Sequence, residues 1–183
     1  MRRELAIQIA GRFDPGEDGL ARKSKDLTMQ LLAHGEKPFS RDRFAPGHIT
    51  CTALIFHPEH PGVLMMHHHK LHRWLLPGGH VDDYDPSLVG TAAREAFEET
   101  GVVIDPGVEP FLAGIDVHGI PPKRNEPYHL HHDLIWCFGA ADGRIEETPE
   151  APRVMWASEA DWDSLILAES IRNSIRRAVE YRR

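Results

Sequence analysis

The chain has few cysteines and no long apolar run, and these absences exclude several protein classes. Among its 183 residues are only two cysteines, Cys51 and Cys137, which excludes a disulfide-rich secreted scaffold. No apolar run approaches the ~20 residues that span a bilayer, and the residues after Met1 lack the apolar stretch of a signal peptide. We therefore expect buried free thiols in a reducing, cytoplasmic compartment, and no membrane partner.

Positive charge is also scarce. Lysine and arginine number 21 against 28 for aspartate and glutamate, so the formal net charge is −7. Polymeric nucleic acid usually requires a basic surface, and no such partner is expected. Small phosphorylated substrates are not excluded by the negative charge, because a bound cation can supply positive charge. At this length the chain forms one domain, or one domain with an extension.

Three glutamates mark a helix in the middle of the chain. Glu95, Glu98 and Glu99 stand at i, i+3 and i+4, which places their carboxylates on one arc of a helix. Like charges at this spacing destabilise a helix, so the alternatives are a solvated acidic face and a cation site. The surroundings favour the cation, since hard divalent ions such as Mg²⁺ take carboxylate oxygens and also bind substrate phosphates.

The limits of this helix can be predicted. Asp85 is expected as the N-cap with Pro86 at the first helical position, and Gly101 as the left-handed residue that ends the helix. Before the helix, residues 74–76 predict a strand end and residues 77–79 a turn that brings backbone close to a ligand. The apolar face that should anchor the helix, opposite the acids, consists of Val89, Ala93, Ala96 and Phe97.

Hydrophobic periodicity predicts the other elements. Helices are expected over residues 5–10, 20–32 and 165–182, strands over 48–56, 63–68, 110–118, 128–138 and 153–156, and a capping box from Ser158 to Asp161. The first two strands are expected to pair as a hairpin.

The residues around the acidic helix resemble the signature of the Nudix hydrolase family. The segment Arg94-Glu95-Ala96-x-Glu98-Glu99-x-Gly101-Val102 matches the second half of that signature almost residue for residue, and Gly79 matches its first glycine. The chain departs from it in three places. Asp85 stands where the first glutamate is expected, one extra residue separates it from Arg94, and Ala96 replaces a larger aliphatic residue. The motif covers residues 77–102, and the strand pattern extends the resemblance to about 47–165.

The resemblance implies an α/β fold, a Nudix-like α/β/α sandwich with a mixed sheet, for a catalytic domain over residues 47–183. Residues 1–46 are predicted to form an N-terminal helical extension, which leaves a homodimer surface, a partner surface and a lid packed on the core as alternatives. The implied activity is a Mg²⁺- or Mn²⁺-dependent hydrolase that cleaves the diphosphate bond of a small nucleotide derivative, a nucleoside diphosphate linked to another group. An isomerase of a small diphosphate and a catalytically silent ligand-sensing module are the alternatives.

The resemblance also implies roles for particular residues. Glu98 and Glu99 are the expected metal ligands, Glu95 is a third ligand or the general base, and the carbonyl of Gly78 or Gly79 is a further ligand. We expect Arg94 to orient the glutamates, since it stands at i to i+4 from Glu98. An acid from a late loop often adds a ligand or the base in such proteins; the candidates are Glu146, Glu147 and Glu150.

Histidine is the second unusual feature, with thirteen in the chain. His129, His131 and Asp133 alternate along a predicted strand and should share one face, while His132 points to the other. Such a set is either a transition-metal site or the polar lining of a substrate pocket. We predict the pocket, without tightly bound transition metal. The other side chains considered for substrate binding are Lys70, Arg73 and His80, with the loop cations Lys123 and Arg124.

Overall fold

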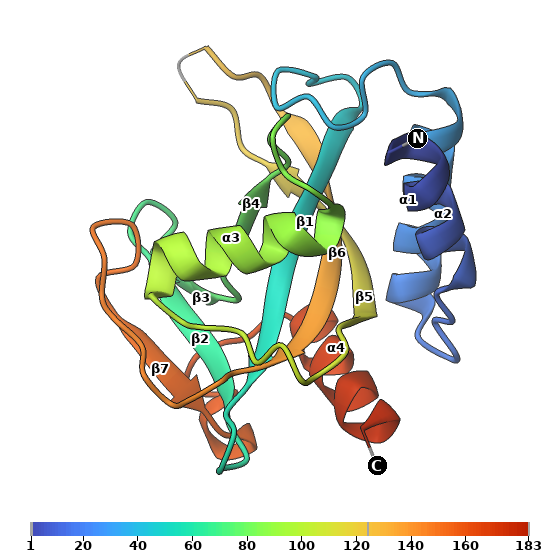
Figure 1. The fold of residues 1–183 in the computed structure, drawn as a ribbon. Helices are drawn as coiled ribbons and strands as arrows, with labels where there is room; N and C mark the ends of the chain where they lie inside the picture. Colours follow the sequence, from blue (N-terminus) through green and yellow to red (C-terminus); the bar gives the residue numbers. More distant parts are fainter. Residues whose placement is uncertain (1, 124, 183) are drawn as a thin grey trace.

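A computed structural model describes residues 2–123 and 125–182 of the chain (Figure 1). Its helices are α1 (Arg2–Arg12), α2 (Gly19–His34), α3 (Leu88–Thr100), α4 (Glu169–Tyr181) and the 3-10 turn η1 (Glu159–Asp161). Its strands are β1 (Gly47–Phe56), β2 (Val63–His68), β3 (Arg73–Leu75), β4 (Gly78–His80), β5 (Phe111–Ile120), β6 (His129–Gly139) and β7 (Val154–Ala157).

The strands form one mixed sheet with β1 at its centre. The strand order is β3-β2-β1-β6-β5, and in addition β4 pairs with β1 and β7 with β2. β1 runs parallel to β6 but antiparallel to β2 and β4. The register sets His48 beside His131, and Thr50 beside both Asp133 and His80. Because side chains alternate between the faces of a strand, this register decides which polar residues meet.

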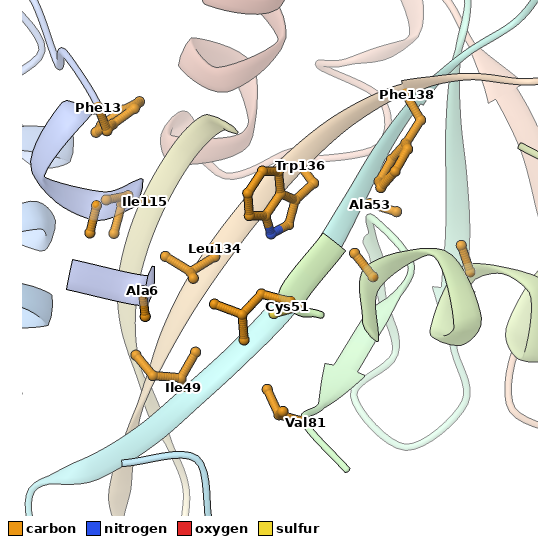
Figure 2. Packing of buried hydrophobic residues seen from close by; sticks show 14 of the residues in the cluster. Ala6, Phe13, Ile49, Cys51, Ala53, Val81, Ile115, Leu134, Trp136 and Phe138 are labelled. Carbon is orange, nitrogen blue, oxygen red and sulfur yellow. The ribbon is translucent and has the colours of Figure 1, made fainter. Parts of the chain in front are cut away.

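The two faces of the sheet bury two separate cores. Alternate residues of β1 and β6 enter the first core together with α3 and the N-terminal helices (Figure 2). The intervening residues enter the second core with α4, where Leu54 and Ile135 lie with Ile171 and Ile175. Helices therefore cover both faces of a mixed sheet, and the expected α/β fold is confirmed.

The N-terminal helices are packed onto the sheet. Ala6, Phe13 and Leu32 are buried in the first core, and Arg177 of α4 forms an ion pair of 3.0 Å with Asp18, the N-cap of α2. The division at residue 46 stays a prediction, although this packing agrees with a lid on the core. In the part of the chain that the structure describes, no helix combines the length and the hydropathy needed to cross a membrane.

Most predicted elements are present. The strands predicted over 48–56, 63–68, 110–118, 128–138 and 153–156 correspond to β1, β2, β5, β6 and β7. β1 and β2 pair as a hairpin, and both cysteines are buried and free. The capping box of Ser158 and Asp161 is present, but it opens η1, so α4 begins at Glu169, later than expected.

Three predictions around α3 are wrong. Gly78 and Gly79 belong to a strand, not a turn, because their backbone pairs with β1. Ser87 is the N-cap in place of Asp85; its side chain accepts a hydrogen bond from the Gly90 N–H. Phe97 is 58% exposed and anchors nothing. The residues of α3 that are buried are Leu88, Thr91, Ala92, Ala96, Glu99 and Thr100.

Candidate active site

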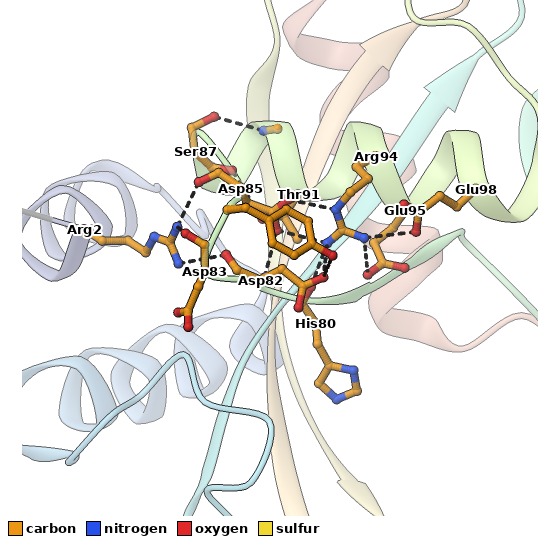
Figure 3. A network of polar contacts seen from close by, with 12 residues as sticks. Arg2, His80, Asp82, Asp83, Asp85, Ser87, Thr91, Arg94, Glu95 and Glu98 are labelled. Carbon is orange, nitrogen blue, oxygen red and sulfur yellow. Dashed lines mark hydrogen bonds and ion pairs between the residues drawn. The ribbon is translucent and has the colours of Figure 1, made fainter.

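Arg94 joins the acidic residues of α3 to the loop before it (Figure 3). Its Nε lies 2.7 Å from Asp85 Oδ1, and its Nη2 lies 2.9 Å from Asp85 Oδ2. Nη1 donates to Glu95 Oε1 at 3.0 Å and to Glu98 Oε2 at 3.1 Å, while Nη2 also donates to the carbonyl of His80. The predicted pairing of Arg94 with Glu98 is therefore present, and one guanidinium orients three carboxylates.

Asp85 serves this network as an anchor. Its side chain is 2% exposed, and it accepts further hydrogen bonds from Thr91 Oγ1 and from the backbone N–H of Asp82. The hydrogen bonds from Arg94 lower the pKa of Asp85 to about 2, despite the burial that opposes this shift. Because both oxygens of Asp85 accept hydrogen bonds from these donors, its carboxylate holds Arg94 in place. Asp85 itself stands at the position where the family signature has its first glutamate.

The three glutamates differ in their surroundings. Glu99 is buried, and burial raises its pKa to about 8 even though the Gly78 N–H donates to Oε2 at 2.8 Å. Burial also raises the pKa of Glu95. The side chain of Glu98 is 55% exposed. The expectation that all three acids face away from the core is wrong for Glu99.

The position of Gly79 makes room for Glu95. A Cβ atom at Gly79 would lie 2.6 Å from both Cδ and Oε2 of Glu95, so only glycine lets this carboxylate approach the backbone of β4. Buried carboxylates with raised pKa values are the chemistry that a divalent cation satisfies, since it replaces the lost hydration of the anions. The side chains of Glu95, Glu98 and Glu99 are therefore the candidate ligands on this helix for a hard divalent cation.

One late-loop acid bears on this site electrostatically. The charge of Glu150 contributes to the raised pKa of Glu99, after burial and the charge of Glu95. Glu146 instead lies against Gly101 at the end of α3, where its backbone N–H donates to Thr100 O. No comparable contact of Glu147 distinguishes it among the described residues. Glu150 is thus the late-loop acid whose charge acts on Glu99.

Three of the predicted substrate-binding cations act on histidines of the sheet. Burial lowers the pKa of His68, and the charges of Lys123 and Lys70 lower it further, while Glu150 opposes them. Glu150 is the residue common to the surroundings of His68 and Glu99. Arg73, at the start of β3, acts on His118 in the same way. Arg124 lies outside the described residues.

A histidine cluster occupies the other side of β4. The ring centroids of His48 and His131 are 4.8 Å apart, those of His48 and His80 5.1 Å, and His129 stacks on His48 at 5.2 Å. Burial lowers the pKa of His80 to about 4 and that of His131 to about 2, so both rings are neutral at pH 7.

The alternation predicted for β6 is confirmed. His129 and His131 reach the cluster, and Asp133 on the same face accepts hydrogen bonds from two threonines of β1. Burial raises the pKa of Asp133. His132 points to the opposite face, where its Nδ1 lies 3.1 Å from Thr28 Oγ1 of α2. His48 joins the cluster without having been predicted, since it opens a strand that otherwise reads as apolar.

Two cavities lie away from the acidic face. One of about 460 Å³ separates the loop before α2 from α4, and one of about 270 Å³ lies between α2 and β6. Neither is lined by a glutamate of α3, so both cavities are separate from the acidic face.

A family model and several solved structures are similar to this chain. A family model described as NUDIX domain matches residues 47–178. The fold is similar to the NUDIX domain of Shewanella oneidensis NrtR, solved in complex with ADP ribose, with a TM-score of 0.57 and 22% identity over 84% of this chain and 97% of that one. It is also similar to the MutT protein from Methanosarcina mazei Go1, with a TM-score of 0.52 and 24% identity over 74% of this chain and 95% of that one.

A third similar structure is the NUDIX hydrolase from Nitrosomonas europaea, with a TM-score of 0.51 and 19% identity over 74% of this chain and 90% of that one. A search of curated protein sequences finds no match. At these identities the structures establish the fold, whereas the family model spans most of the chain. The chain therefore belongs to the NUDIX domain family, and its helix α3 carries the Arg-Glu-x-x-Glu-Glu sequence of a Nudix-type hydrolase.

Proposed function

We propose that the chain is a Mg²⁺- or Mn²⁺-dependent hydrolase that cleaves the diphosphate bond of a nucleoside diphosphate linked to another group. The observation that carries this proposal is the acidic face of α3. There Arg94 holds the exposed Glu98 and a Glu95 seated against Gly79, and the Gly78 N–H donates to the buried Glu99. A purely structural acidic helix would expose its carboxylates to water and would not bury one of them beside another.

The residues have distinct roles in this proposal. Glu98 and Glu99 would hold the cation, with the carbonyl of Gly79 as a further ligand, and Glu95 would be the third ligand or the general base. A divalent ion held there would neutralise charge on the phosphate oxygens and lower the pKa of the attacking water. Arg94 keeps the carboxylates in place, and Glu150 adds negative charge beside Glu99. Water attacks phosphorus, and the bond from phosphorus to the bridging anhydride oxygen breaks.

The substrate is proposed to be a small nucleotide derivative. Lys70 and Arg73 would bind the phosphate remote from the metal by charge-assisted hydrogen bonds, and His129, His131 and His80 line the neighbouring face of the sheet. ADP ribose, the compound in the structure of the similar NrtR domain, has this chemistry: a nucleoside diphosphate joined to a sugar. The buried free thiols are consistent with a reducing, cytoplasmic compartment.

A substrate panel tests the proposal. Full-length protein is incubated with nucleotide sugars, dinucleotides and oxidised nucleotides in Mg²⁺ or Mn²⁺, and the products are separated by chromatography. We expect two phosphorylated fragments from at least one compound. An isomerase would instead convert a diphosphate without releasing phosphate, and a ligand-sensing module would bind without turnover.

Variants connect the activity to α3. Glu98→Gln should lower kcat by at least about a hundredfold, the scale of losing a group that stabilises transition-state charge. Glu180→Gln, on the exposed face of α4, is the matched control and should be silent. Hydrolysis that survives in Glu98→Gln at saturating Mg²⁺ would remove the metal assignment.

A further inference from the structure

Three histidines from three neighbouring strands converge on one point. The parallel pairing of β1 with β6 places His48 beside His131, and the antiparallel pairing of β1 with β4 places His80 beside Thr50, which shares a face with His48. The ligating nitrogens of His48, His80 and His131 all lie within 4.8 Å of one another. Among the described residues, this is the one group of three histidine, cysteine or acidic side chains with that geometry.

His48 carries the second observation. Its side chain is 1% exposed, and its Nδ1 lies 3.0 Å from the carbonyl oxygen of Arg43. A carbonyl can only accept, so Nδ1 holds the proton and Nε2 presents a lone pair. This Nε2 atom is buried and has no hydrogen-bond partner. A buried acceptor without a partner is destabilising, and a backbone carbonyl on the opposite ring nitrogen is the arrangement that orients metal-binding histidines.

The composition of the cluster agrees with ligation. The rings of His80 and His131 pack against the ring of His48, with centroids 5.1 Å and 4.8 Å from it. The carboxylate of Asp133 is held by the hydroxyls of Thr50 and Thr52. The donor set is therefore three imidazoles without a carboxylate. Nitrogen donors of this kind suit divalent transition metals, whereas Mg²⁺ prefers oxygen.

We propose that His48, His80 and His131 bind a divalent transition-metal ion, zinc in the first instance, in a three-histidine site with an open coordination position. Zinc–nitrogen bonds of about 2.1 Å place tetrahedral donors roughly 3.4 Å apart, so the rings need to close by about 1.4 Å from the 4.8 Å limit. This assignment replaces the expectation that the face lacks a tightly bound transition metal.

The histidine site is separate from the acidic face of α3. The carbonyl of His80 accepts a hydrogen bond from Arg94, but its ring points away from the Arg94 network (Figure 3). The two sites therefore lie on either side of β4. The proposal does not depend on the hydrolase activity, and zinc at this site would tie β1, β4 and β6 together at one end of the sheet.

Metal analysis of full-length protein tests the site. After chelation and dialysis, the protein is titrated with zinc by calorimetry, and with cobalt by the visible absorption that reports its coordination. We expect one ion per chain. His80→Asn and His131→Asn should each weaken binding by at least about a hundredfold, because loss of an outer-shell partner alone already weakens it by about 10–100-fold.

Three control variants separate this site from others. His132→Asn alters the opposite face of β6 and should leave zinc binding intact, as should Glu98→Gln on α3. The double variant His69→Asn/His72→Asn tests an adventitious surface site before β3. Circular dichroism checks that each variant is folded, and His80 and His131 are both only partly buried. A wild-type chain that binds no zinc, or zinc lost in the His69/His72 variant and kept in His80→Asn, would overturn the proposal.

Discussion

Asp85 and Arg94 form a two-point ion pair, with Nε to Oδ1 at 2.7 Å and Nη2 to Oδ2 at 2.9 Å. The carboxylate comes from a loop and the guanidinium from the middle of α3, so the pair fixes the rotation of the helix relative to β4. Arg94 also holds Glu95 and Glu98. The departure from the family signature at Asp85 therefore changes the residue that positions Arg94 and, through it, the acidic face.

Asp85→Asn should therefore be costly. The amide keeps the volume but loses the charge opposite Arg94, and breaking a buried pair in this way costs about 3–5 kcal/mol. The partial exposure of Arg94, 19%, places the expected loss of unfolding free energy near the lower end, about 3 kcal/mol. Asp82→Asn is the control, because Asp82 lies 3.6 Å from Arg94 and is 39% exposed; its loss should stay under about 1 kcal/mol. Equal losses in urea denaturation would contradict the anchoring role.

Much of the fold follows from local sequence. Strands β1, β2, β5, β6 and β7 are legible as β-rich runs between turn signals, and Gly101 ends α3 in the left-handed conformation expected of it. The short strand β4 is not legible. Its Pro-Gly-Gly sequence predicts a turn, and only pairing with β1, a contact distant in sequence, makes it a strand.

The site could be predicted only in part. The motif of Arg94 and the glutamates is local in sequence and could be predicted. Asp85, by contrast, resembles an N-cap in the sequence, and only the structure shows that its carboxylate binds Arg94, nine residues later. Periodicity predicts that His129 and His131 share a face, because alternation is a property of a single strand. Periodicity cannot predict that His48 joins them, since the position of His48 in the cluster depends on the β1–β6 register.

Glu99 should make the metal-free protein less stable as pH rises. Its pKa of about 8 in the folded state lies above the usual 4.5, so between these values the unfolded chain releases a proton that the folded chain keeps. By linkage, the free energy of unfolding then falls from about pH 4.5 to pH 8. In chelator, Glu99→Gln should flatten this fall, while Glu98→Gln should not. Identical pH slopes for wild type and Glu99→Gln would show that Glu99 ionises normally.

The same residue links pH to the cation. Metal binding requires the Glu99 carboxylate, so Mg²⁺ should raise the melting temperature of the wild type more at pH 8 than at pH 6. Glu99→Gln should lose this dependence. Thermal melts with and without Mg²⁺ at the two pH values measure it, and a Mg²⁺ shift of equal size in the variant would exclude Glu99 as a ligand.

Gly79→Ala should impair catalysis more than stability. The new methyl group would lie 2.6 Å from the carboxyl carbon of Glu95, and this flexible side chain can move away, leaving its position on the acidic face. We expect kcat to fall at least about tenfold with a small change in melting temperature. Gly78→Ala is the contrast, because its methyl would meet backbone atoms of Cys51 and Thr52 at 2.6 Å, and overpacking of this kind costs about 1–3 kcal/mol. A fully active Gly79→Ala enzyme would contradict the need for Glu95 at this position.

Helix α1 should support the active site through Arg2. Its guanidinium donates to the carbonyls of Asp82 at 3.1 Å and Asp85 at 2.8 Å, and so holds the backbone of the loop that anchors Arg94 (Figure 3). Arg2→Ala should lower stability by about 1–2 kcal/mol and reduce kcat severalfold, because Asp85 gains freedom to move. Arg3→Ala is matched in position but removes a bond to Gly35 at the end of α2, away from this loop. It should lower stability to a similar extent without changing kcat. If both variants lose activity equally, the N-terminal helices stabilise the fold in general and do not brace the Asp85 loop.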